Sequence, residues 1–304
     1  PPRSTLFPYT TLFRSGVLRC ERAEEILARA WEAIGGTLII DADPAEPDVS
    51  TPSSDERALS VRMNWSSVAI IRSRLESAQG LMLAAVESSA RAARIQKSAA
   101  SLYEAGRTLD AVGRRTEAKA LYLEAVKSND YATDDDMYDP RPALSLAAAQ
   151  QRDGDLASAR AVLESIILDA GKRGATIERI ADAKTTMKSL PSPLLIDAVL
   201  KAHFNLALLN INNKSFPSAE SRLNSLLKTP DAVIGDDSAL IRSIWRRALG
   251  DGYAAQNRTK DAVNQYRDAV RLDPLNAGAW ASLSLALTDK SESLDALRRA
   301  AAIR

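Results

Sequence analysis

Residues 243–276 read SIWRRALGDGYAAQNRTKDAVNQYRDAVRLDPLN, and this stretch decides the fold. Apolar, small and aromatic residues recur there at helical spacing, in two runs separated by a polar break at 256–258. Pro274 follows the second run, as is typical of a helix that has just ended. The positions that share a face within each run are Leu249, Gly250 and Tyr253, then Ala262, Tyr266 and Ala269. The stretch therefore predicts two helices joined by a short turn and packed through these faces.

The residues after this stretch repeat its spacing in phase. Leu283 lies 34 residues after Leu249, and Ala296 lies 34 residues after Ala262. The pattern resembles the tetratricopeptide repeat family, which has a period of 34 and the order Leu-Gly, Tyr, Ala, aromatic, Pro that 243–276 contains. This resemblance implies an all-α fold, an α-solenoid of antiparallel helix pairs that forms a tetratricopeptide-like superhelix.

Three earlier copies keep parts of the same spacing. The spacing between equivalent residues of neighbouring copies exceeds 34 by 7, 26, 9 and 0 residues. Such extra residues are accommodated in the segments between repeats. We expect two tetratricopeptide-like repeats at 99–173, a helical insert at 174–199, and three repeats at 200–304, the last of them truncated. The alanines at the position where two helices come closest are Ala118, Ala159, Ala219, Ala262 and Ala296.

The N-terminal part of the chain fits the repeat poorly. Residues 5–15, TLFPYTTLFRS, resemble one reading frame of a sequencing adapter, so 1–15 is interpreted as a non-native or disordered segment. The alternative is a genuine disordered N-terminus. Residues 16–98 are expected to form helices of unclear repeat register, with a Pro-, Ser- and Asp-rich linker near 43–56 and a break between two helices near Gln79-Gly80.

Composition narrows the classes of function. The 40 Lys and Arg residues against 39 Asp and Glu residues leave a net charge of +1, which gives no overall field to attract nucleic acid. Hydrophobic residues make up 45% of the chain and aromatic residues only 5%, which favours closely packed helices. No apolar run approaches the roughly 20 residues of a membrane-spanning helix. The compartment is not determined, with the cytoplasm preferred over the periplasm.

The sequence holds few residues for catalysis. It has one histidine, His203, one cysteine, Cys20, and no Gly-rich phosphate loop, so the usual nucleophile-base pairs, zinc sites and P-loops cannot be assembled. We interpret His203 as structural and Cys20 as a buried or incidental thiol. The acidic run at 134–136 lacks the alternating ligands of a calcium loop. The protein is therefore expected not to be an enzyme, and no catalytic residue, cofactor or metal is predicted.

Stacked helix pairs offer a concave surface lined by the first helix of each repeat. By the resemblance, the side chains that face this groove lie three residues before the glycine position, and one and four residues after it, with further residues nearby on the same helices. A mixed basic and apolar groove favours a protein or peptide partner, acidic and with a hydrophobic anchor. The candidate partner-binding residues are Tyr103, Arg107, Arg141, Leu144, Gln151, Lys201, Phe204, Asn205, Leu208, Arg247 and Asp251.

Two considerations limit this groove. Phe204, Leu208 and Ile211 can equally well pack on the insert helix at 176–190, with no partner involved. Chaperone-binding members of the family place an Asn directly after the glycine position, whereas this sequence has other residues there, so their carboxylate clamp is not expected. The residues at that position are Arg107, Ala148, Leu208, Asp251 and Leu285.

The sequence thus predicts a non-catalytic scaffold that binds a protein or peptide in the concave groove of a repeat array. The alternative is that the repeats are the recognition arm of a larger enzyme, a glycosyltransferase or kinase, or of a transcriptional regulator whose other domain lies outside this chain. Self-association through the last helix is also expected, because Leu294, Leu297 and Ile303 form an apolar face on it.

Overall fold

The structure is a computed structural model that describes residues 8–33, 36, 38–39, 46–47, 56–129, 138–182 and 191–303. The chain divides into two compact units, Pro1–Ala149 and Gln150–Arg304, each of which is described by itself. Both units consist of helices that follow one another in antiparallel pairs, so the expected all-α class is confirmed. The acidic run at 134–136 and most of the linker near 43–56 lie outside the described residues.

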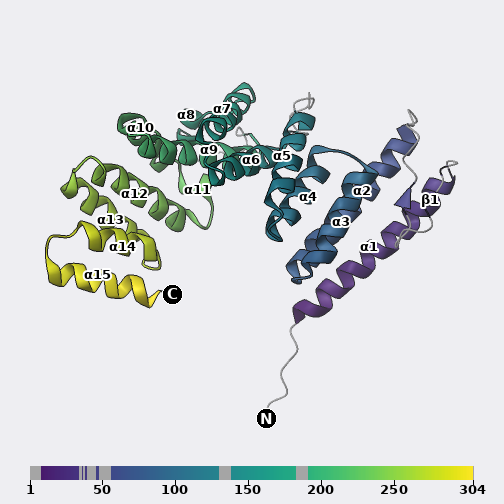
Figure 1. The fold of residues 1–304 in the computed structure, drawn as a ribbon, viewed down its shortest axis with the longest axis horizontal. Coiled ribbons are helices and arrows are strands. Elements are labelled where there is room, and N and C mark those ends of the chain that lie inside the picture. Colours follow the sequence, from purple (N-terminus) through teal and green to yellow (C-terminus); the bar gives the residue numbers. More distant parts are fainter. Residues whose placement is uncertain are drawn as a thin grey trace, which may run out of the picture. The chain divides into compact units, whose positions relative to one another are not determined.

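In the first unit, five helices lie side by side in chain order, coloured purple to blue in Figure 1. A pair of two-residue strands, which the sequence did not lead us to expect, joins in antiparallel register, Leu38 opposite Pro47 and Ile39 opposite Glu46. Helix α6 begins in this unit and ends in the second. The elements are α1 (Pro8–Ala33), β1 (Leu38–Ile39), β2 (Glu46–Pro47), α2 (Glu56–Ala78), α3 (Met82–Ile95), α4 (Ala99–Ala111), α5 (Arg115–Asn129) and α6 (Arg141–Arg152).

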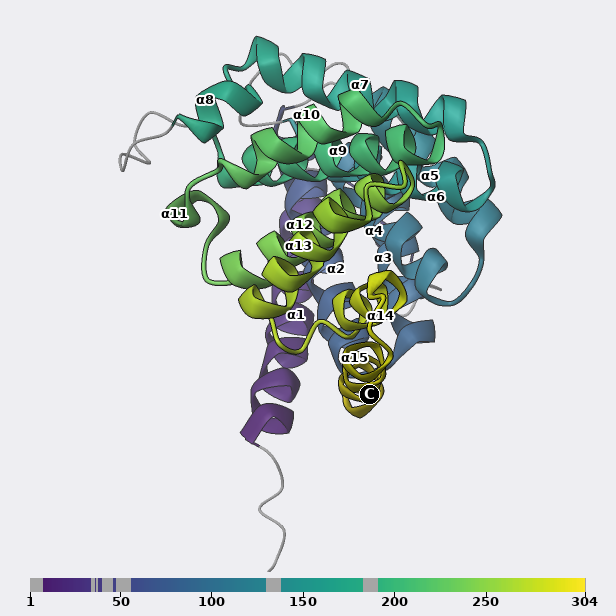
Figure 2. The ribbon, with the colours of Figure 1, turned by 90° about the vertical axis from the view of Figure 1, so that its left-hand side faces the viewer.

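The second unit contains the stretch from which the repeat was recognised. Its last two helices lie next to each other, drawn in yellow in Figure 2. Two short helices, α8 and α11, stand outside the repeat pairs. The elements are α7 (Leu156–Lys172), α8 (Ile177–Ala181), α9 (Pro193–Asn212), α10 (Phe216–Leu227), α11 (Asp231–Ile234), α12 (Ser238–Ala254), α13 (Thr259–Leu272), α14 (Ala277–Ala286) and α15 (Lys290–Ala302).

The turn inside each of four repeats ends its first helix in the same way. The residue five positions before the tight alanine has a positive φ, and the residue after it donates its N–H to a carbonyl five positions earlier, as in a Schellman motif. Glycine adopts this conformation without strain, but two of the four positions hold other residue types. The positive-φ residues are Gly113, Gly154, Lys214 and Asn257.

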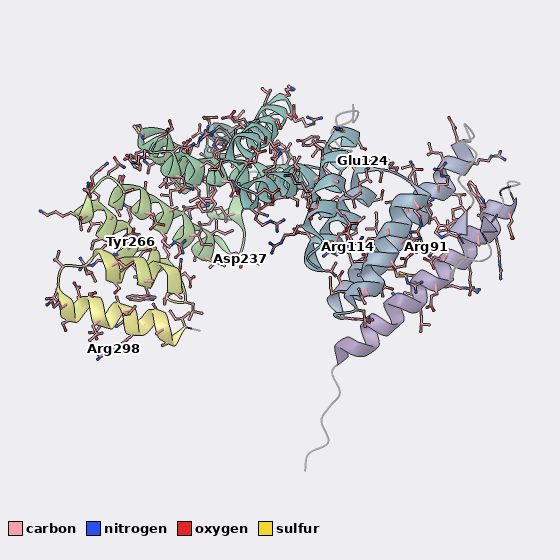
Figure 3. The ribbon with its side chains drawn as sticks, in the orientation of Figure 1. Arg91, Arg114, Glu124, Asp237, Tyr266 and Arg298 are labelled. Carbon is pink, nitrogen blue, oxygen red and sulfur yellow. The ribbon has the colours of Figure 1, made fainter. Side chains whose placement is uncertain are left out.

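The tight alanines are all buried, at 3% exposure or less. In the first and fourth repeats the partner helix places a tyrosine ring over a glycine, and Tyr266 is labelled in Figure 3. A Cβ atom added to Gly106 would lie 2.7 Å from a ring carbon of Tyr122, and one added to Gly250 would lie 2.5 Å from a ring carbon of Tyr266. The glycines are therefore required because the aromatic ring takes the volume that a side chain would need.

Several element boundaries differ from those expected. Helix α1 is helical from Pro8, inside the segment 1–15 that we had excluded, although the side chains there are not described. The expected insert helix at 176–190 is a helix only over Ile177–Ala181, and 183–190 lie outside the described residues. Helix α9 begins at Pro193, earlier than the expected boundary at 200, because Ser192 caps it and a proline is well tolerated in the first turn.

Among the described residues, α9 is a candidate membrane span by length and composition, although we expected no such stretch. Its 18-residue window has a mean hydropathy of 1.5, and 61% of the window is buried inside the fold. Helices α7, α10 and α12 all contact it. This environment is that of a core helix, which explains why its sequence is apolar nearly all the way round.

Candidate partner-binding site

The predicted groove residues fall in both units. Tyr103, Arg107, Arg141 and Leu144 belong to the first unit, and all four are half-buried. The second unit holds Gln151, Lys201, Phe204, Asn205, Leu208, Arg247 and Asp251, of which Lys201 is exposed and the rest are half-buried. A single groove that runs through all of them stays a prediction.

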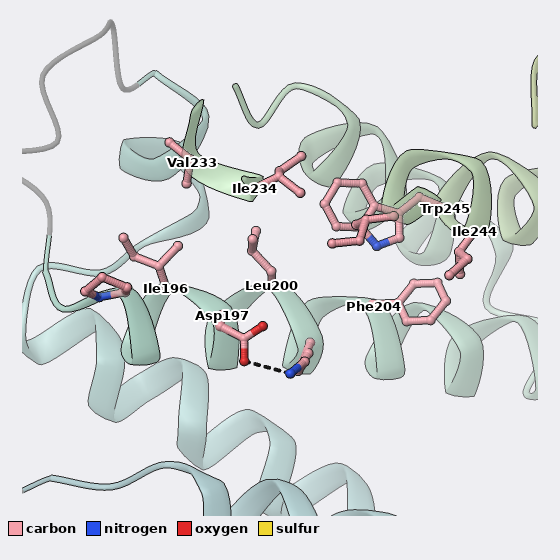
Figure 4. Close-up of a pocket in the computed structure, with 11 residues that line it drawn as sticks. Ile196, Asp197, Leu200, Phe204, Val233, Ile234, Ile244 and Trp245 are labelled. Carbon is pink, nitrogen blue, oxygen red and sulfur yellow. Dashed lines mark hydrogen bonds and ion pairs between the residues drawn. The ribbon is translucent and has the colours of Figure 1, made fainter. Parts of the chain in front are cut away.

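The second unit contains an apolar cavity of about 340 Å³ between α9, α11 and the first turns of α12 (Figure 4). Phe204, which was a candidate groove residue, lies beside Ile244 and Trp245 at one end of it. The polar side chains in its lining are Asp197 and Lys201, both from α9. The full lining is Pro193, Ile196, Asp197, Leu200, Lys201, Phe204, Val233, Ile234, Ile241, Ile244 and Trp245.

Helix α11 owes its position to one arginine. The Arg242 guanidinium of α12 donates to the Leu227 carbonyl at 2.6 Å, to the Thr229 carbonyl, and to Asp231 Oδ1 at 2.7 Å. These bonds hold the chain between α10 and α12, where the nine extra residues between the third and fourth repeats are found. Gly235, at φ 90°, then ends α11. The segment between α10 and α12 thereby places Val233 and Ile234 of α11 over the cavity.

The structure places two of the three apolar groove positions for which we left an alternative open. Phe204 faces α11 and α12 in the cavity. The Cδ1 atom of Ile211 lies 3.5 Å from where a Cβ on Gly252 of α12 would stand. Phe204 and Ile211 therefore both lie next to α12 of the following repeat.

Two basic candidate residues of the second unit have carboxylate partners on their own helices. Lys201 Nζ donates to Asp197 Oδ2 at 2.7 Å on its own helix, and Arg247 Nε lies 3.8 Å from Asp251 Oδ2. Asn205 donates its side-chain amide to the Lys201 carbonyl at 2.9 Å. Residues four apart on one helix face are natural partners, which the sequence pattern alone could have indicated. The two cations are therefore locally neutralised.

Asp251 has a structural partner as well. The Tyr266 hydroxyl donates to Asp251 Oδ1 at 2.8 Å, and burial together with this carboxylate raises the pKa of Tyr266. This bond fixes the ring that fills the space over Gly250. Asp251 thus positions the helix pair, and its part in binding a partner stays a prediction.

The first unit has a second cavity, of about 480 Å³, and six of the seven residues that line it have charged or polar side chains. Tyr103 and Arg107 from α4 meet Arg141 from α6 there, so three of the candidate residues do come together. Two further members, Arg74 of α2 and the buried Glu104 of α4, were not predicted from the sequence. Arg74, Ser77, Ala78, Tyr103, Glu104, Arg107 and Arg141 line this cavity.

The single histidine is buried, at 7% exposure, as a structural residue would be. Its Nδ1 lies 3.2 Å from Arg222 Nη1, so Nδ1 accepts this bond from the guanidinium and the proton of the neutral ring is on Nε2. Burial, and then the charge of Arg222, lower the pKa of His203 to about 4. Cys20 is a buried thiol. No group of His, Cys, Asp and Glu residues that could hold a metal is found among the described residues.

Sequence reasoning missed most of the apolar cavity. Only Phe204 and Lys201 were candidates, because the repeat pattern predicts groove residues on first helices. It does not cover Val233 and Ile234, which lie on α11 between two repeats. The nine-residue excess between the third and fourth repeats was the available signal. Trp245, one of four tryptophans in the chain, was a second signal, because a buried aromatic residue often contributes most to a packed site.

Comparison with known proteins gives structural neighbours only. No family model matches the sequence, and no curated protein is significantly similar to it. Cut9 in the APC/C hetero-tetramer Cut9-Hcn1 matches 82% of this chain at a TM-score of 0.53 and 11% identity. This chain spans 43% of that one.

Two further solved structures are similar in part. BtubC from P. vanneervenii matches 81% of this chain and 91% of its own at a TM-score of 0.53 and 18% identity. YrrB, described as a TPR protein with an unusual peptide-binding site, matches 81% of this chain and all of its own at a TM-score of 0.46 and 15% identity. At these identities the likeness concerns the fold alone. The chain has the tetratricopeptide-like fold of a helical solenoid.

Proposed function

We propose that this protein is a non-catalytic scaffold that binds a segment of a partner protein through the apolar cavity between α9, α11 and α12. The observation that carries the proposal is the cavity itself, whose lining is apolar except for Asp197 and Lys201. Ligand sites are typically concave, mostly apolar and largely preformed, with a small number of polar groups. A bulky apolar side chain of the partner would fill it.

Charge supports an uncharged anchor at this cavity. The two charged groups of the lining bond to each other, and Asp231 at the start of α11 bonds to Arg242. No net charge remains among these four residues. Burying one Leu, Ile or Phe side chain contributes roughly 1.5–3 kcal/mol, which is enough for one anchor to dominate a modest interface.

The proposal can be tested with a phage-displayed library of random peptides selected against the whole chain. We expect the enriched peptides to share one bulky apolar residue. Isothermal titration measures their affinity for the chain. Ile244→Asp places a charge on the wall at a residue that is already partly exposed, so the fold should persist. We expect this variant to lose at least tenfold in affinity.

Leu168→Asp is the matched control, because Leu168 is an exposed apolar residue of α7 in the same unit but does not line the cavity. It should bind as the unchanged chain does. Equal affinity of Ile244→Asp and the unchanged chain for every selected peptide would refute the site, provided both proteins have the same helical circular dichroism.

A further inference from the structure

The polar cavity of the first unit is arranged around one buried carboxylate. Glu104 of α4 is 1% exposed. Its Oε2 accepts a bond from Arg74 Nε of α2 at 3.1 Å, and its Oε1 accepts one from Arg107 Nη2 at 2.5 Å. Arg107 Nη2 also donates to Ser77 Oγ of α2 at 3.2 Å. Glu104 thus fixes two guanidinium groups from different helices at one wall of the cavity.

A third guanidinium is held by other means. Arg141 donates to both carboxylate oxygens of Asp139, at 2.9 Å and 2.7 Å, and its Cζ lies 5.2 Å from the centre of the Tyr103 ring. The carboxylate bonds raise the pKa of Arg141, and those of Glu104 raise the pKa of Arg107, so both groups stay charged. Tyr103 adds an aromatic ring to the same lining.

The charges of this cluster do not balance. Among the described residues of this cluster, three guanidinium groups face two carboxylates, so one positive charge remains. Arg74 uses only its Nε in the bonds described, which leaves its two terminal nitrogens directed to other partners or solvent. Arginine forks match carboxylate and phosphate oxygens equally well in shape. A single carboxylate neutralises the excess charge, whereas a phosphate, which carries about −1.5 to −2, would exceed it.

We propose that this cavity binds one acidic side chain, glutamate or aspartate, of a partner protein. The inference rests on the proposed function, because it names a second kind of contact, in the first unit, through which a scaffold recognises a partner protein. It also places the acidic preference at Arg74, Arg107 and Arg141, where three guanidinium groups share two carboxylates, instead of at Lys201 and Arg247, each of which has a carboxylate of its own. The methylene groups of a glutamate would lie against Tyr103 and Ala78, and its carboxylate would meet the unpaired arginine nitrogens.

The test uses blocked peptides on the whole chain, acetyl-EEEE-amide against acetyl-QQQQ-amide, followed by the side-chain Nε–Hε signals of arginine in NMR spectra. We expect saturable shifts at Arg74, Arg107 and Arg141 with the acidic peptide only. Arg74→Gln leaves Glu104 with Arg107 as a partner, and Arg141→Gln removes a half-exposed group, so both variants should fold. Each should weaken binding at least threefold, and Arg141→Lys should weaken it less than Arg141→Gln.

Arg114→Gln is the control, because Arg114 is an exposed arginine of the same unit that pairs with Glu117 away from the cavity. It should leave the titration unchanged. Absence of shifts, or equal shifts with the glutamine peptide, would overturn the inference and leave the cluster as a link between helices. Tighter binding of inorganic phosphate, or of an acetyl-QQQQ peptide with a free carboxyl end, would overturn the choice of an acidic side chain. The proposed function is tested separately, by the selected peptides that are expected to bind in the cavity between α9, α11 and α12.

Discussion

Tyr122 and Tyr266 each lie over a glycine, and this pairing of a large with a small residue was visible in the sequence. The middle repeats have Ala147 and Ala207 at the glycine position and aliphatic residues at the aromatic one, so the small residue grows where the large one shrinks. What the sequence could not show was the distance between the two faces. That distance makes Gly250 intolerant of any side chain.

We predict that Gly250→Leu lowers the free energy of unfolding by roughly 1–3 kcal/mol through overpacking against Tyr266. Chemical denaturation measures the change. Gly252→Ala on the same helix is the control, because its Cβ would stand at an ordinary contact distance of 3.5 Å from Ile211 and alanine favours the helix. A Gly250→Leu variant as stable as the Gly252→Ala variant would show that the register of this helix pair is wrong.

His203 should make stability fall in mild acid. The pKa of His203 is about 4 in the folded chain and 6.5 for the free side chain. Between these two pH values the unfolded chain therefore binds a proton that the folded chain does not bind. The contribution of the neutral His203 to the free energy of unfolding is complete above pH 6.5. It is lost as the pH falls toward 4, by up to about 3 kcal/mol. Burial and then the charge of Arg222 disfavour the imidazolium, and Glu178 only partly offsets them.

The measurement compares unfolding free energies at pH 7.5 and pH 4.5 for the unchanged chain and for His203→Gln. Carboxylates titrate in both proteins, so the difference between the two pH dependences isolates the histidine. We expect the variant to lose less stability on acidification. Identical losses would mean that the imidazole becomes protonated inside the fold at its ordinary pKa.

At the scale of elements, the helix pairs of the repeats followed from the 34-residue spacing, and the break near Gln79-Gly80 was found between α2 and α3. Helix α11 did not follow from it. Its four residues carry no periodic signal, and it is held by bonds from Arg242 on another helix to backbone carbonyls. Such contacts depend on tertiary structure, so a pattern read from local sequence cannot contain them. The same reason explains why Arg74 and Glu104 were missed.

We predict that Arg242→Ala destabilises the chain by roughly 1–3 kcal/mol, because Thr229 is fully buried and its carbonyl would lose a charged donor. The variant should also expose Trp245, which a red shift of the tryptophan fluorescence would report. Arg271→Ala is the control, since Arg271 is exposed and pairs only with Asp268 in the bonds described. A change for Arg242→Ala no larger than that of the control would mean that α11 is held in another way.

At the scale of the whole molecule, the apolar side chains of the last two helices are unusually open. Leu285 is 90% exposed, and Leu294 and Leu297 are about half exposed. Part of the neighbouring surface is covered, because the Arg299 guanidinium lies over the Trp280 ring. Exposed apolar groups on adjacent helices favour association with another surface.

We predict that the chain self-associates through α14 and α15. In sedimentation velocity experiments, Leu285→Ser combined with Leu297→Lys should raise the monomer fraction at a fixed concentration. Leu168→Lys changes a leucine of α7 that is 62% exposed and should leave the monomer fraction unchanged. A chain that is monomeric at high concentration without any substitution would contradict this prediction.

The most direct test of the central claim, that a partner segment binds in the apolar cavity of the second unit, is hydrogen–deuterium exchange of the whole chain with and without a selected peptide. We expect slower exchange in 193–212 and 231–245, which contain the cavity walls on α9, α11 and α12. Exchange in α13 and α15 should change little. Protection confined to those two helices, with none around the cavity, would contradict the account.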